Sequence, residues 1–541
     1  MTIRSNTLFY GDNLDVLRKY IPEESVDLIY LDLPFNSKTD YNILFKESTG
    51  EESTAQIQAF TDFWHWDAVA NRAYYYLVTE APNTDTADLI EAIFKFLGRN
   101  DMMAYLVMMG ERLLELHRVL KSTDSLFLHC DTTASHYLKL LLDSIFEPRN
   151  FRNEIIWKRF NFHADAKRFG RVSDRLLFYS KTDEYKFRRV RAPFKKDYIE
   201  SHFTYKDENG QRYTTSDLNP PGGRGPIYEF HGIKRPWRFE EKKILELEKK
   251  GLIYTKSKVP RLIRYLDELE ARGGAAVHEI WDDISLNSMA NERLGFQTQK
   301  PSPLLERVIK AGSDRGDWVL DPFCGCGTAI AAAEKLGRRW IGIDVTYLAI
   351  NLVKKRVKDS FPDVNFIVEG EPKDLGAAKE LAKNPYQFQW WALSLIDAKP
   401  VGSTLAKPEA GRKGADEGVD GWIRLIDGLE GPVKKVVVQV KSGHVSVKDI
   451  RELRDVVMRQ KGVIGVFITL EEPTSEMVKE VKTTDPYVST KWNREYPAIQ
   501  ILTVAELLHG KKPELPPAIS PLQEAPRIEK IRSRFVQEKL A

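Results

Sequence analysis

Residues 318–344 read WVLDPFCGCGTAIAAAEKLGRRWIGID, in which a glycine-containing turn and an alanine-rich segment separate two apolar runs. The first apolar run ends at Asp321, the turn contains Gly325 and Gly327, and the second run ends at Asp344. This order predicts a strand, a tight turn, a helix and a second strand, the repeating unit of an open α/β sheet. In such sheets ligands bind beyond the carboxyl ends of the strands, where both aspartates lie.

The turn of this unit suits a nucleotide-like ligand. Glycines allow a ligand to approach the backbone, and an acid about 20 positions beyond such a loop, as Asp344 is, can bind ribose hydroxyls. The turn lacks the Gly-x-Gly-x-x-Gly pattern of nicotinamide dinucleotide sites and the Gly-Lys-Ser/Thr of Walker loops. Cys324 and Cys326 have no partner ligands near them in the sequence, so small residues packed at the turn explain them more simply than a metal pair.

A second unit of this kind begins the chain. Thr7-Leu8-Phe9-Tyr10 predicts a strand, and Gly11-Asp12-Asn13 predicts a turn in which Asp12 is either a helix N-cap or a ligand-binding residue. The next apolar run, 26–31, leads into Asp32-Leu33-Pro34-Phe35, which supplies a carboxylate, a stiffened backbone and an aromatic ring at one place. These groups suit a flat heterocycle with an exocyclic amino group, although a chance strand-ending turn has the same composition.

Strands and helices alternate up to residue 182. Residues 101–120 have the apolar periodicity of a helix. Further buried strands are predicted at 125–129, 150–159 and 175–180. The alternation predicts a mostly parallel, doubly wound sheet. Residues 36–100 look less regular, with a local hydrophobic cluster at 60–67, and His129-Cys130-Asp131 is interpreted as a strand end because zinc-spaced partners are missing.

The sequence changes character between residues 183 and 290. Basic residues crowd the span 186–196, further on they alternate with aromatic residues, and Pro220-Pro221-Gly222-Gly223 marks a loop. This mixture suits simultaneous contact with phosphates and bases, while an ordinary solvated surface is the alternative. The residues expected to contact DNA are Arg212, Arg224, Arg235 and Arg238.

Two motifs together resemble the signatures of the amino-group DNA methyltransferases: Asp32-Leu33-Pro34-Phe35 and Asp321-Pro322-Phe323-Cys324-Gly325-Cys326-Gly327-Thr328. The catalytic tetrapeptide precedes the cofactor loop and a long basic insert separates them, which is the order of the β-class enzymes. Thr298-Gln299-Lys300-Pro301 resembles the additional cofactor motif of that class, and Asn36-Ser37 and residues 150–159 also match. The resemblance spans residues 7–360 and implies a Rossmann-like α/β methyltransferase domain with an inserted target-recognition region.

The resemblance implies transfer of a methyl group from S-adenosylmethionine to N6 of adenine or N4 of cytosine, with the base flipped out of double-stranded DNA. Phe35 would stack on the base, and the Asp32 carboxylate and the Leu33 carbonyl would accept hydrogen bonds from its amino group. The family usually has proline where this chain has Leu33, so the turn loses the fixed φ of a proline. Aspartate at position 32 favours adenine, since the cytosine enzymes more often have serine there.

The same resemblance assigns the cofactor site. The residues expected to bind S-adenosylmethionine are Asp12, Thr298, Lys300, Asp321, Phe323, Gly325, Gly327, Thr328 and Asp344. Among them Asp344 would hold the ribose and Asp12 would lie by the adenine ring. Thr298 and Lys300 would support the methionine part, which the turn after Asp321 would line.

Residues 385–510 predict a second α/β domain. Asp420, Gln439 and Lys441 resemble the Asp…(Asp/Glu/Gln)-x-Lys site of restriction-type nucleases of the Mrr-like branch, and period-two spacing puts Gln439 and Lys441 on one strand face. By that resemblance Asp420 and Gln439 would hold Mg²⁺ and Lys441 would stabilise phosphate charge. Glutamine in place of glutamate weakens the metal site, so a structural or DNA-holding domain without cleavage is the alternative.

The length of 541 residues suits several domains. The expected boundaries are 1–182 and 291–375 for the two halves of the methyltransferase, 183–290 for the insert, 385–510 for the restriction-endonuclease-like domain, and 511–541 for a proline-rich, charged tail. The net charge of +3 requires any DNA binding to come from local basic patches. Three cysteines fit a reducing cytoplasm better than a disulfide scaffold, and apolar runs long enough for a membrane span or a signal peptide are not found.

We therefore expect a cytoplasmic, site-specific DNA methyltransferase of a restriction–modification system, fused to a nuclease-like domain. Methylation with an inactive C-terminal domain is one alternative, and a DNA-binding regulator without catalysis is another. The recognition sequence and the oligomeric state, a homodimer included, are left open.

Overall fold

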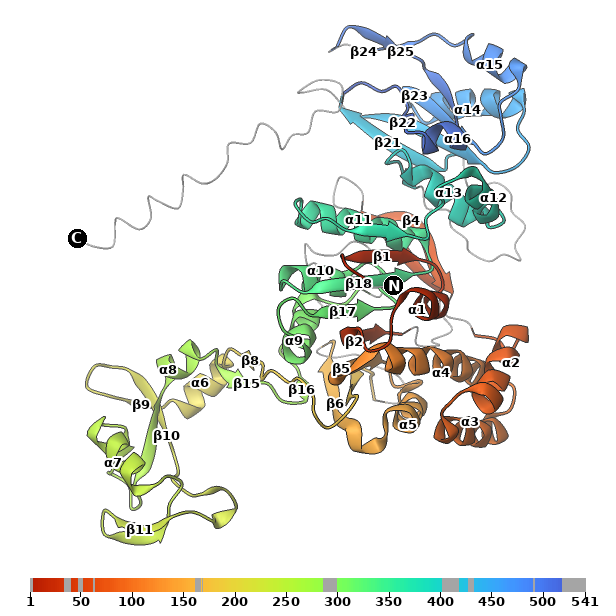
Figure 1. Cartoon of the computed structure of the whole chain (residues 1–541). Helices are drawn as coiled ribbons and strands as arrows, with labels where there is room; N and C mark the ends of the chain where they lie inside the picture. The colour runs from red at the N-terminus through yellow and green to blue at the C-terminus, as the bar shows by residue number, and fades with distance from the viewer. Residues whose placement is uncertain are drawn as a thin grey trace, which may run out of the picture.

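The structure is a computed structural model that describes residues 3–33, 64–160, 167, 169–285, 299–400, 418–426, 433–489 and 492–517, and the backbone of 40–46 and 52–61. Figure 1 shows a central α/β domain, an elongated insert that extends from one side of it, and a smaller α/β domain formed by the C-terminal third. In the described part of the chain, no helix is both long and apolar enough to cross a membrane.

A nine-stranded sheet forms the central domain. In spatial order its strands are β16 (Ile280–Trp281), β6 (Phe151–Lys158), β7 (Ser173–Ser180), β5 (Leu120–Cys130), β2 (Val26–Asp32), β17 (Trp318–Asp321), β18 (Arg339–Asp344), β1 (Thr7–Tyr10) and β19 (Ile367–Glu369). Strand β7 runs antiparallel to β5 and β6, and the other described neighbours pair in parallel. The mostly parallel sheet predicted from the alternation of elements is confirmed.

Strands from before and after the insert interleave at the centre of this sheet. Strand β17 pairs with β2, with Leu320 opposite Ile29, and β18 pairs with β1, with Asp344 opposite Tyr10. Because neighbouring parallel strands bring their carboxyl ends to one edge, the turns after β1, β2, β17 and β18 meet there. Segments that are distant in the chain thus share one side of the sheet.

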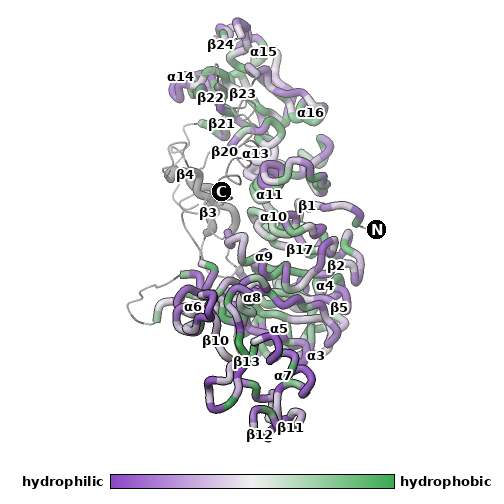
Figure 2. The backbone as a smooth tube through the Cα atoms, turned by 90° about the vertical axis from the view of Figure 1, so that its left-hand side faces the viewer, coloured by the Kyte–Doolittle hydropathy of each residue, from purple (hydrophilic) through white to green (hydrophobic). Residues whose placement is uncertain are grey.

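Helices cover both faces of the sheet, and the two-residue period of β2 assigns Ile29 and Leu31 to one core and Leu28 and Tyr30 to the other. The first face carries α1 (Asn13–Tyr20), α2 (Ala68–Tyr75), the π-helix η1 (Tyr76–Glu80), α3 (Thr84–Leu97), α4 (Asp101–Val119), α5 (Ser135–Phe146) and the 3₁₀ turn η2 (Pro148–Asn150). The second face carries α9 (Ser302–Gly312), α10 (Thr328–Lys335) and α11 (Tyr347–Ser360). In Figure 2 the hydrophilic stretches follow the outer helices and much of the insert.

Residues 36–100 contain more regular structure than the sequence indicated. Strands β3 (Asp40–Lys46) and β4 (Glu52–Thr61) pair as an antiparallel hairpin, and α2 and α3 follow. Helix α3 begins after the capping residue Asn83 and buries Ile90 and Ile93. The expectation of little regular structure was wrong, because only a few apolar residues of this helix carry the helical spacing.

The insert lies between β7 and α9 and has a small core of its own. Its elements are β8 (Arg191–Ala192), α6 (Lys196–His202), β9 (Tyr205–Lys206), β10 (Arg212–Ser216), η3 (Pro221–Gly223), β11 (Ile227–Phe230), β12 (Ile233–Pro236), α7 (Glu241–Lys249), β13 (Ile253–Tyr254), β14 (Arg261–Tyr265), α8 (Leu266–Ala271) and β15 (Ala275–Ala276). Leu218, Phe230, Trp237, Ile244 and Ile253 form the core, so this extension does not depend on the main sheet for its packing.

The C-terminal domain contains a five-stranded mixed sheet. Its strands, in spatial order, are β20 (Lys399–Pro400), β21 (Gly421–Ile426), β22 (Val433–Lys441), β23 (Ile464–Thr469) and β26 (Ile499–Thr503), with a separate hairpin of β24 (Tyr487–Ser489) and β25 (Arg494–Tyr496). Its helices are α12 (Leu375–Leu381), α13 (Pro385–Ser394), α14 (Val447–Arg459), α15 (Ser475–Val481) and α16 (Val504–Leu508).

Helix α13 connects this domain to the central one. Tyr347 of α11 shares a buried cluster with Phe388 and Trp391 of α13 and with Val436 of β22. The backbone amide of Tyr347 also donates to the side-chain oxygen of Gln387, at 3.0 Å. The two domains are therefore joined through a common apolar core.

Candidate active site

The carboxyl ends of β1, β2, β17 and β18 surround a cavity of about 250 Å³. The strand ends contribute Gly11, Asp12, Asn13, Asp32, Leu33, residues 321–326, Thr328, Asp344, Val345 and Thr346 to its lining. Trp64, Arg112, Gln299 and Lys300 add to the lining from other elements. The cavity thus brings together the two turns and the additional motif that the sequence singled out separately.

Asp321 and Asp344 face the cavity from neighbouring strands. The Asp321 carboxylate accepts a hydrogen bond from the Phe323 amide at 3.2 Å, and Asp344 accepts from the amides of Gly325 and Thr346 at 2.9 and 2.8 Å. Burial raises the pKa of both carboxyls above the usual range, and the negative charge of Asp32 raises that of Asp321 further. Buried acceptors of this kind are stabilised by a ligand that brings hydrogen-bond donors.

The two glycines of this turn have different roles. Both have positive φ, 48° at Gly325 and 73° at Gly327, so side chains are disfavoured at either position. Gly325 lines the cavity, whereas a Cβ at Gly327 would lie 2.8 Å from Cγ2 of Val353 in α11. Gly327 therefore allows α10 and α11 to pack closely and is not part of the described lining.

Asp12 combines the two roles that the sequence left open. It caps α1 and also lines the cavity. Arg112 of α4 donates to both oxygens of this carboxylate, at 2.8 and 3.1 Å, and to the side-chain oxygen of Asn13 at 2.7 Å. Asn13 donates in turn to the carbonyl of Pro322 at 2.8 Å, so one arginine connects the turn after β1 with the turn after β17.

Sequence reasoning missed Arg112 and Trp64. Arg112 lies three residues after Met109 and four before Leu116, both buried on the same helix, so a charged residue in an apolar stripe was the available signal. Trp64 belongs to the aromatic-rich stretch that was interpreted as a local cluster. It does pack on Tyr105, with ring centroids 5.5 Å apart, but it also lines the cavity.

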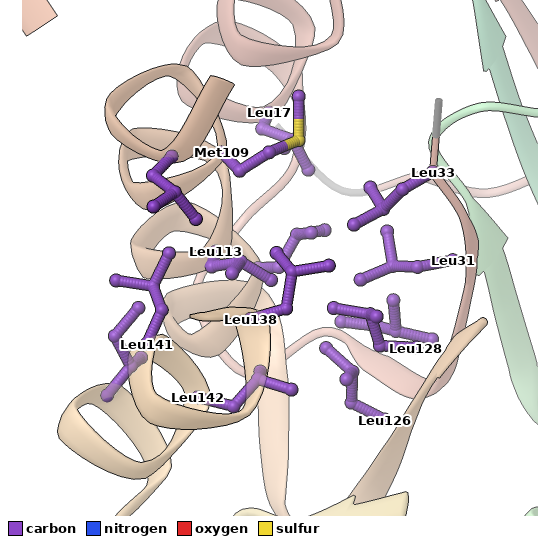
Figure 3. Packing of buried hydrophobic residues seen from close by; sticks show 14 of the residues in the cluster. Leu17, Leu31, Leu33, Met109, Leu113, Leu126, Leu128, Leu138, Leu141 and Leu142 are labelled. Atoms are coloured by element: carbon purple, nitrogen blue, oxygen red, sulfur yellow. The ribbon is translucent and has the colours of Figure 1, made fainter. Parts of the chain in front are cut away.

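Asp32 ends β2, and Lys300 binds its carboxylate. The Lys300 Nζ lies 2.6 Å from each carboxylate oxygen, with side chains 8% and 20% exposed for lysine and aspartate. Leu33 is buried in the first core beside Leu17 and Met109, as Figure 3 shows, so packing anchors the turn where the family usually has proline. Pro34, Phe35 and Thr298 lie outside the described residues.

The four arginines expected to contact DNA lie on the insert but in different surroundings. Arg212 and Arg224 are exposed. Arg238 is exposed beside Phe239, 5.9 Å from the ring centroid. Arg235 hydrogen-bonds to Asn219 and lies over the ring of Trp237, so it contributes to the fold of the insert.

The start of the basic span does not form a DNA-facing surface. Lys186 Nζ lies 3.2, 3.2 and 2.9 Å from carboxylate oxygens of Asp27, Asp124 and Asp317, and Arg188 pairs with Asp314 at 2.7 Å. These acids belong to β2, β5 and the segment before β17. The interpretation of this part of the span as phosphate-binding was therefore wrong, because these cations hold strands of the sheet together.

The three nuclease-like residues lie at neighbouring strands of the C-terminal sheet but bind within the protein. Asp420 accepts from the Val440 amide at 2.7 Å, and the buried Gln439 donates to the Gly418 carbonyl. Lys441 Nζ lies 3.7 Å from a carboxylate oxygen of Asp449. Within the described ranges no group of three His, Cys, Asp or Glu residues could hold a metal ion. The geometry gives no support to a Mg²⁺ site at Asp420 and Gln439.

Residues 26–355, more than half of the chain, match a family model described as DNA methylase. The chain belongs to the DNA methylase family. The cofactor implied by the motifs, S-adenosylmethionine, is confirmed with this family. Residues 406–509 of this DNA methylase match a second model, described as NACHT-associated inactive restriction endonuclease 1. A nuclease-type fold is thereby confirmed for the C-terminal domain, its Mrr-like branch is not, and the description favours the alternative without cleavage.

Several similar proteins modify DNA. The type II methyltransferase M.EcaI of Enterobacter cloacae is 30% identical over 264 residues, which are 47% of this chain and 57% of that protein. The Mod subunit of a type III restriction-modification enzyme of Salmonella typhimurium is 25% identical over 362 residues, 61% of this chain and 50% of that protein. This DNA methylase therefore spans little more than half the length of either relative. A solved Thermus thermophilus protein complexed with S-adenosyl-L-methionine has a TM-score of 0.33 at 16% identity, covering 68% of this chain and 99% of that one.

Proposed function

We propose that this chain is a site-specific DNA methyltransferase that transfers a methyl group from S-adenosylmethionine to N6 of a flipped adenine. The observation that carries the proposal is the placement of Asp32, Asp321 and Asp344 around one cavity. A relative from Escherichia coli strain K12, 24% identical over 356 residues, is a DNA adenine methyltransferase, which supports adenine as the target. N4 of cytosine is the second candidate, since both amino groups have the same donors.

The residues around the cavity fit the cofactor. Asp344 would accept hydrogen bonds from the ribose hydroxyls, and Asp12, fixed by Arg112, would lie by the adenine ring. Asp321, Phe323, Gly325, Thr328 and Lys300 would surround the methionine part, and Thr298 is assigned there by its motif. S-adenosylmethionine supplies an electrophilic methyl group on its sulfonium sulfur.

The base-binding turn is organised by Asp32. Its carboxylate would accept a hydrogen bond from the amino group of the base, together with the Leu33 carbonyl, and so direct the nitrogen lone pair at the methyl group. Lys300 favours the ionised, accepting form of Asp32, and each oxygen keeps a further lone pair for the substrate. Phe35 would stack on the ring, with Pro34 fixing the turn. Positioning of the two reactants would supply most of the rate gain.

Mapping of methylated bases tests this proposal. Plasmid DNA incubated with the purified chain and S-adenosylmethionine is expected to carry N6-methyladenine at every copy of one short sequence. N4-methylcytosine at such a sequence would decide for the second candidate. DNA without any added methyl group, under conditions in which the protein is folded and binds DNA, would leave only the DNA-binding regulator.

The Asp344→Ala variant is expected to bind S-adenosylmethionine about 10–100-fold more weakly, because hydrogen bonds to a charged acceptor contribute about 1.5–3 kcal/mol. Isothermal titration calorimetry measures the change without DNA. The Asp363→Ala variant, which removes an exposed acid after α11, is the matched control and should bind normally. Equal affinity in both variants would argue against the ribose assignment.

The insert is proposed to bind double-stranded DNA through exposed cations. Removing Arg212 or Arg224 by alanine substitution should weaken binding to all DNA sequences and reduce the slope of log affinity against log salt concentration by about 1 for each lost phosphate contact. Fluorescence anisotropy over a salt series gives this slope. Arg188→Ala, at the ion pair with Asp314, is the control, and its slope should equal that of the unaltered protein.

We also propose a place in a restriction–modification system, supported by relatives of that kind, with the C-terminal domain holding DNA without cutting it. Plasmids incubated with Mg²⁺ should remain uncut by the unaltered protein and by Lys441→Ala alike. Cleavage that depends on Lys441, on DNA with unmethylated target sites, would show that the domain is an active nuclease. Whether the protein forms a homodimer is open to sedimentation measurements.

A further inference from the structure

Three polar side chains form a buried hydrogen-bonded chain beside Asp32. Tyr30 Oη lies 2.9 Å from Nδ1 of His129, and Nε2 of His129 lies 3.1 Å from a carboxylate oxygen of Asp174. His129 and Asp174 are 0% exposed and Tyr30 is 2% exposed. The sequence indicated only a strand end at His129, whereas the structure places the imidazole between a phenol and a carboxylate.

The strand register aligns this chain with the base-binding turn. His129 of β5 is directly opposite Asp32 of β2, and Asp174 of β7 is two residues from Leu176, the partner of His129 on the other side. Tyr30 and Asp32 are two positions apart on β2, so both point to the same face. Tyr30 lines the cavity, so the chain runs from the cavity wall to Asp174 inside the sheet.

The direction of these hydrogen bonds follows from Asp174. An ionised carboxylate only accepts, so Nε2 of His129 donates to it, and Nδ1 of the neutral ring accepts the Tyr30 hydroxyl proton. Burial alone would raise the pKa of Asp174, but the hydrogen bond from His129 and the charges of His129 and Arg159 outweigh burial and lower it. Arg159 Nε lies 3.2 Å from the other carboxylate oxygen. The Tyr30 oxygen keeps its lone pairs for a donor in the cavity.

We infer that His129, through Tyr30, takes up the proton that methyl transfer releases from the amino group of the base. This inference rests on the proposed function. As the nitrogen bonds to the methyl carbon, the carbon–sulfur bond breaks and its electron pair stays on sulfur, which leaves the nitrogen cationic with one hydrogen too many. That proton passes to Tyr30 Oη while the Tyr30 proton passes to His129 Nδ1. The products are a neutral methylated amine, an unchanged phenol and an imidazolium paired with Asp174.

The charges around His129 favour this acceptor over Asp32. Both oxygens of Asp32 are bound by Lys300, which makes this carboxylate a weak base. The imidazolium would lie against Asp174, with Asp32 opposite it on the next strand and Asp321 among the charges that act on Tyr30. Arg159 and Lys300 are the cations that act on Asp174. Negative groups therefore surround the imidazole most closely, as an imidazolium requires.

Single-turnover methyl transfer, measured over a pH series with cofactor and DNA in excess of their dissociation constants, tests the inference. Tyr30→Phe keeps the ring and should lower the rate about tenfold or more, with unchanged binding of S-adenosylmethionine. Asp174→Asn should lower the plateau and move the acidic limb of the profile to lower pH, because the imidazolium loses its stabilising charge. In heavy water the unaltered protein should react more slowly.

Tyr179→Phe is the matched control, since Tyr179 is a buried tyrosine of β7 that donates to Asp143 at 2.6 Å, away from the cavity. It should change the melting temperature and leave the pH profile and the rate as they are. An unaltered rate and pH profile in Tyr30→Phe, or the absence of any solvent isotope effect, would overturn the inference. If Asp32→Ala is inactive in the same assay, the proposed function survives that result. If the unaltered chain transfers no methyl group, the proposed function itself fails.

Discussion

Replacing Asp32 with alanine is expected to lower methyl-transfer turnover by about 10²–10³-fold, the effect of removing one preorganised polar contact to a reacting group. Without the carboxylate, the amino group of the base loses the acceptor that directs its lone pair. Binding of S-adenosylmethionine should change by less than about threefold, because the lost contact acts on the base in the transition state. Tritium transfer to DNA and calorimetry with the cofactor give the two numbers.

Two further variants separate chemistry from folding. Asp32→Ala also removes the partner of Lys300 in a nearly buried place, so Asp32→Ala/Lys300→Met should recover stability without recovering turnover. Asp359→Ala removes another lysine–carboxylate pair, with Lys355 at 2.5 Å on the exposed side of α11, and should keep full turnover. Turnover of the unaltered protein's size in Asp32→Ala would remove this residue from the mechanism.

The Lys186→Met variant is expected to lower the free energy of unfolding by about 3–5 kcal/mol, the usual cost of leaving buried charges without their partner. Lys186 contacts Asp27, Asp124 and Asp317, and the side chains of the first two are 3% and 0% exposed. Urea denaturation followed by circular dichroism measures the loss. Lys355→Met, which breaks an exposed pair, should cost only about 0.3–0.5 kcal/mol.

The loss in Lys186→Met should depend on pH. Burial already raises the pKa of Asp124, and without the lysine this carboxyl would take up a proton in the folded state at still higher pH. A folded-state pKa above the unfolded value makes the folded state more stable as the pH falls. The difference between Lys186→Met and the unaltered protein should therefore be largest near neutral pH and narrow on acidification. A difference that widens on acidification would contradict this role of Lys186.

Local patterns predicted the strands that hold the site. The apolar runs before Asp32 and Asp321 and the glycine turn after Asp321 each carry their signal within a few residues, so β2, β17 and α10 followed from the sequence. The position of these turns at one edge of the sheet followed from the rule for parallel strands. Leu33 was expected to loosen its turn, yet its side chain is buried among apolar residues of the first core.

The interactions within the site had no local signal. The pair of Lys300 with Asp32, the chain from Tyr30 to Asp174, and the three partners of Lys186 all depend on which strands become neighbours and in what register. Sequence spacing gives the face of a strand but not its neighbour. Composition misled at Lys186, because a lysine in a basic span and a lysine among buried acids look alike until the chain is folded.

Helix α13 explains why a nuclease-type domain would be kept after losing its chemistry. Gln387 binds the amide of Tyr347, which directly follows the cavity residues Asp344, Val345 and Thr346, and Trp391 fills the core beneath it. A chain shortened before α13 would expose this apolar surface to water and release the end of the segment that carries Asp344. A mutation that abolishes cutting leaves methyl transfer intact, whereas a deletion of the domain would damage both. Selection for methylation alone is then enough to preserve the domain's fold while its former active-site residues drift.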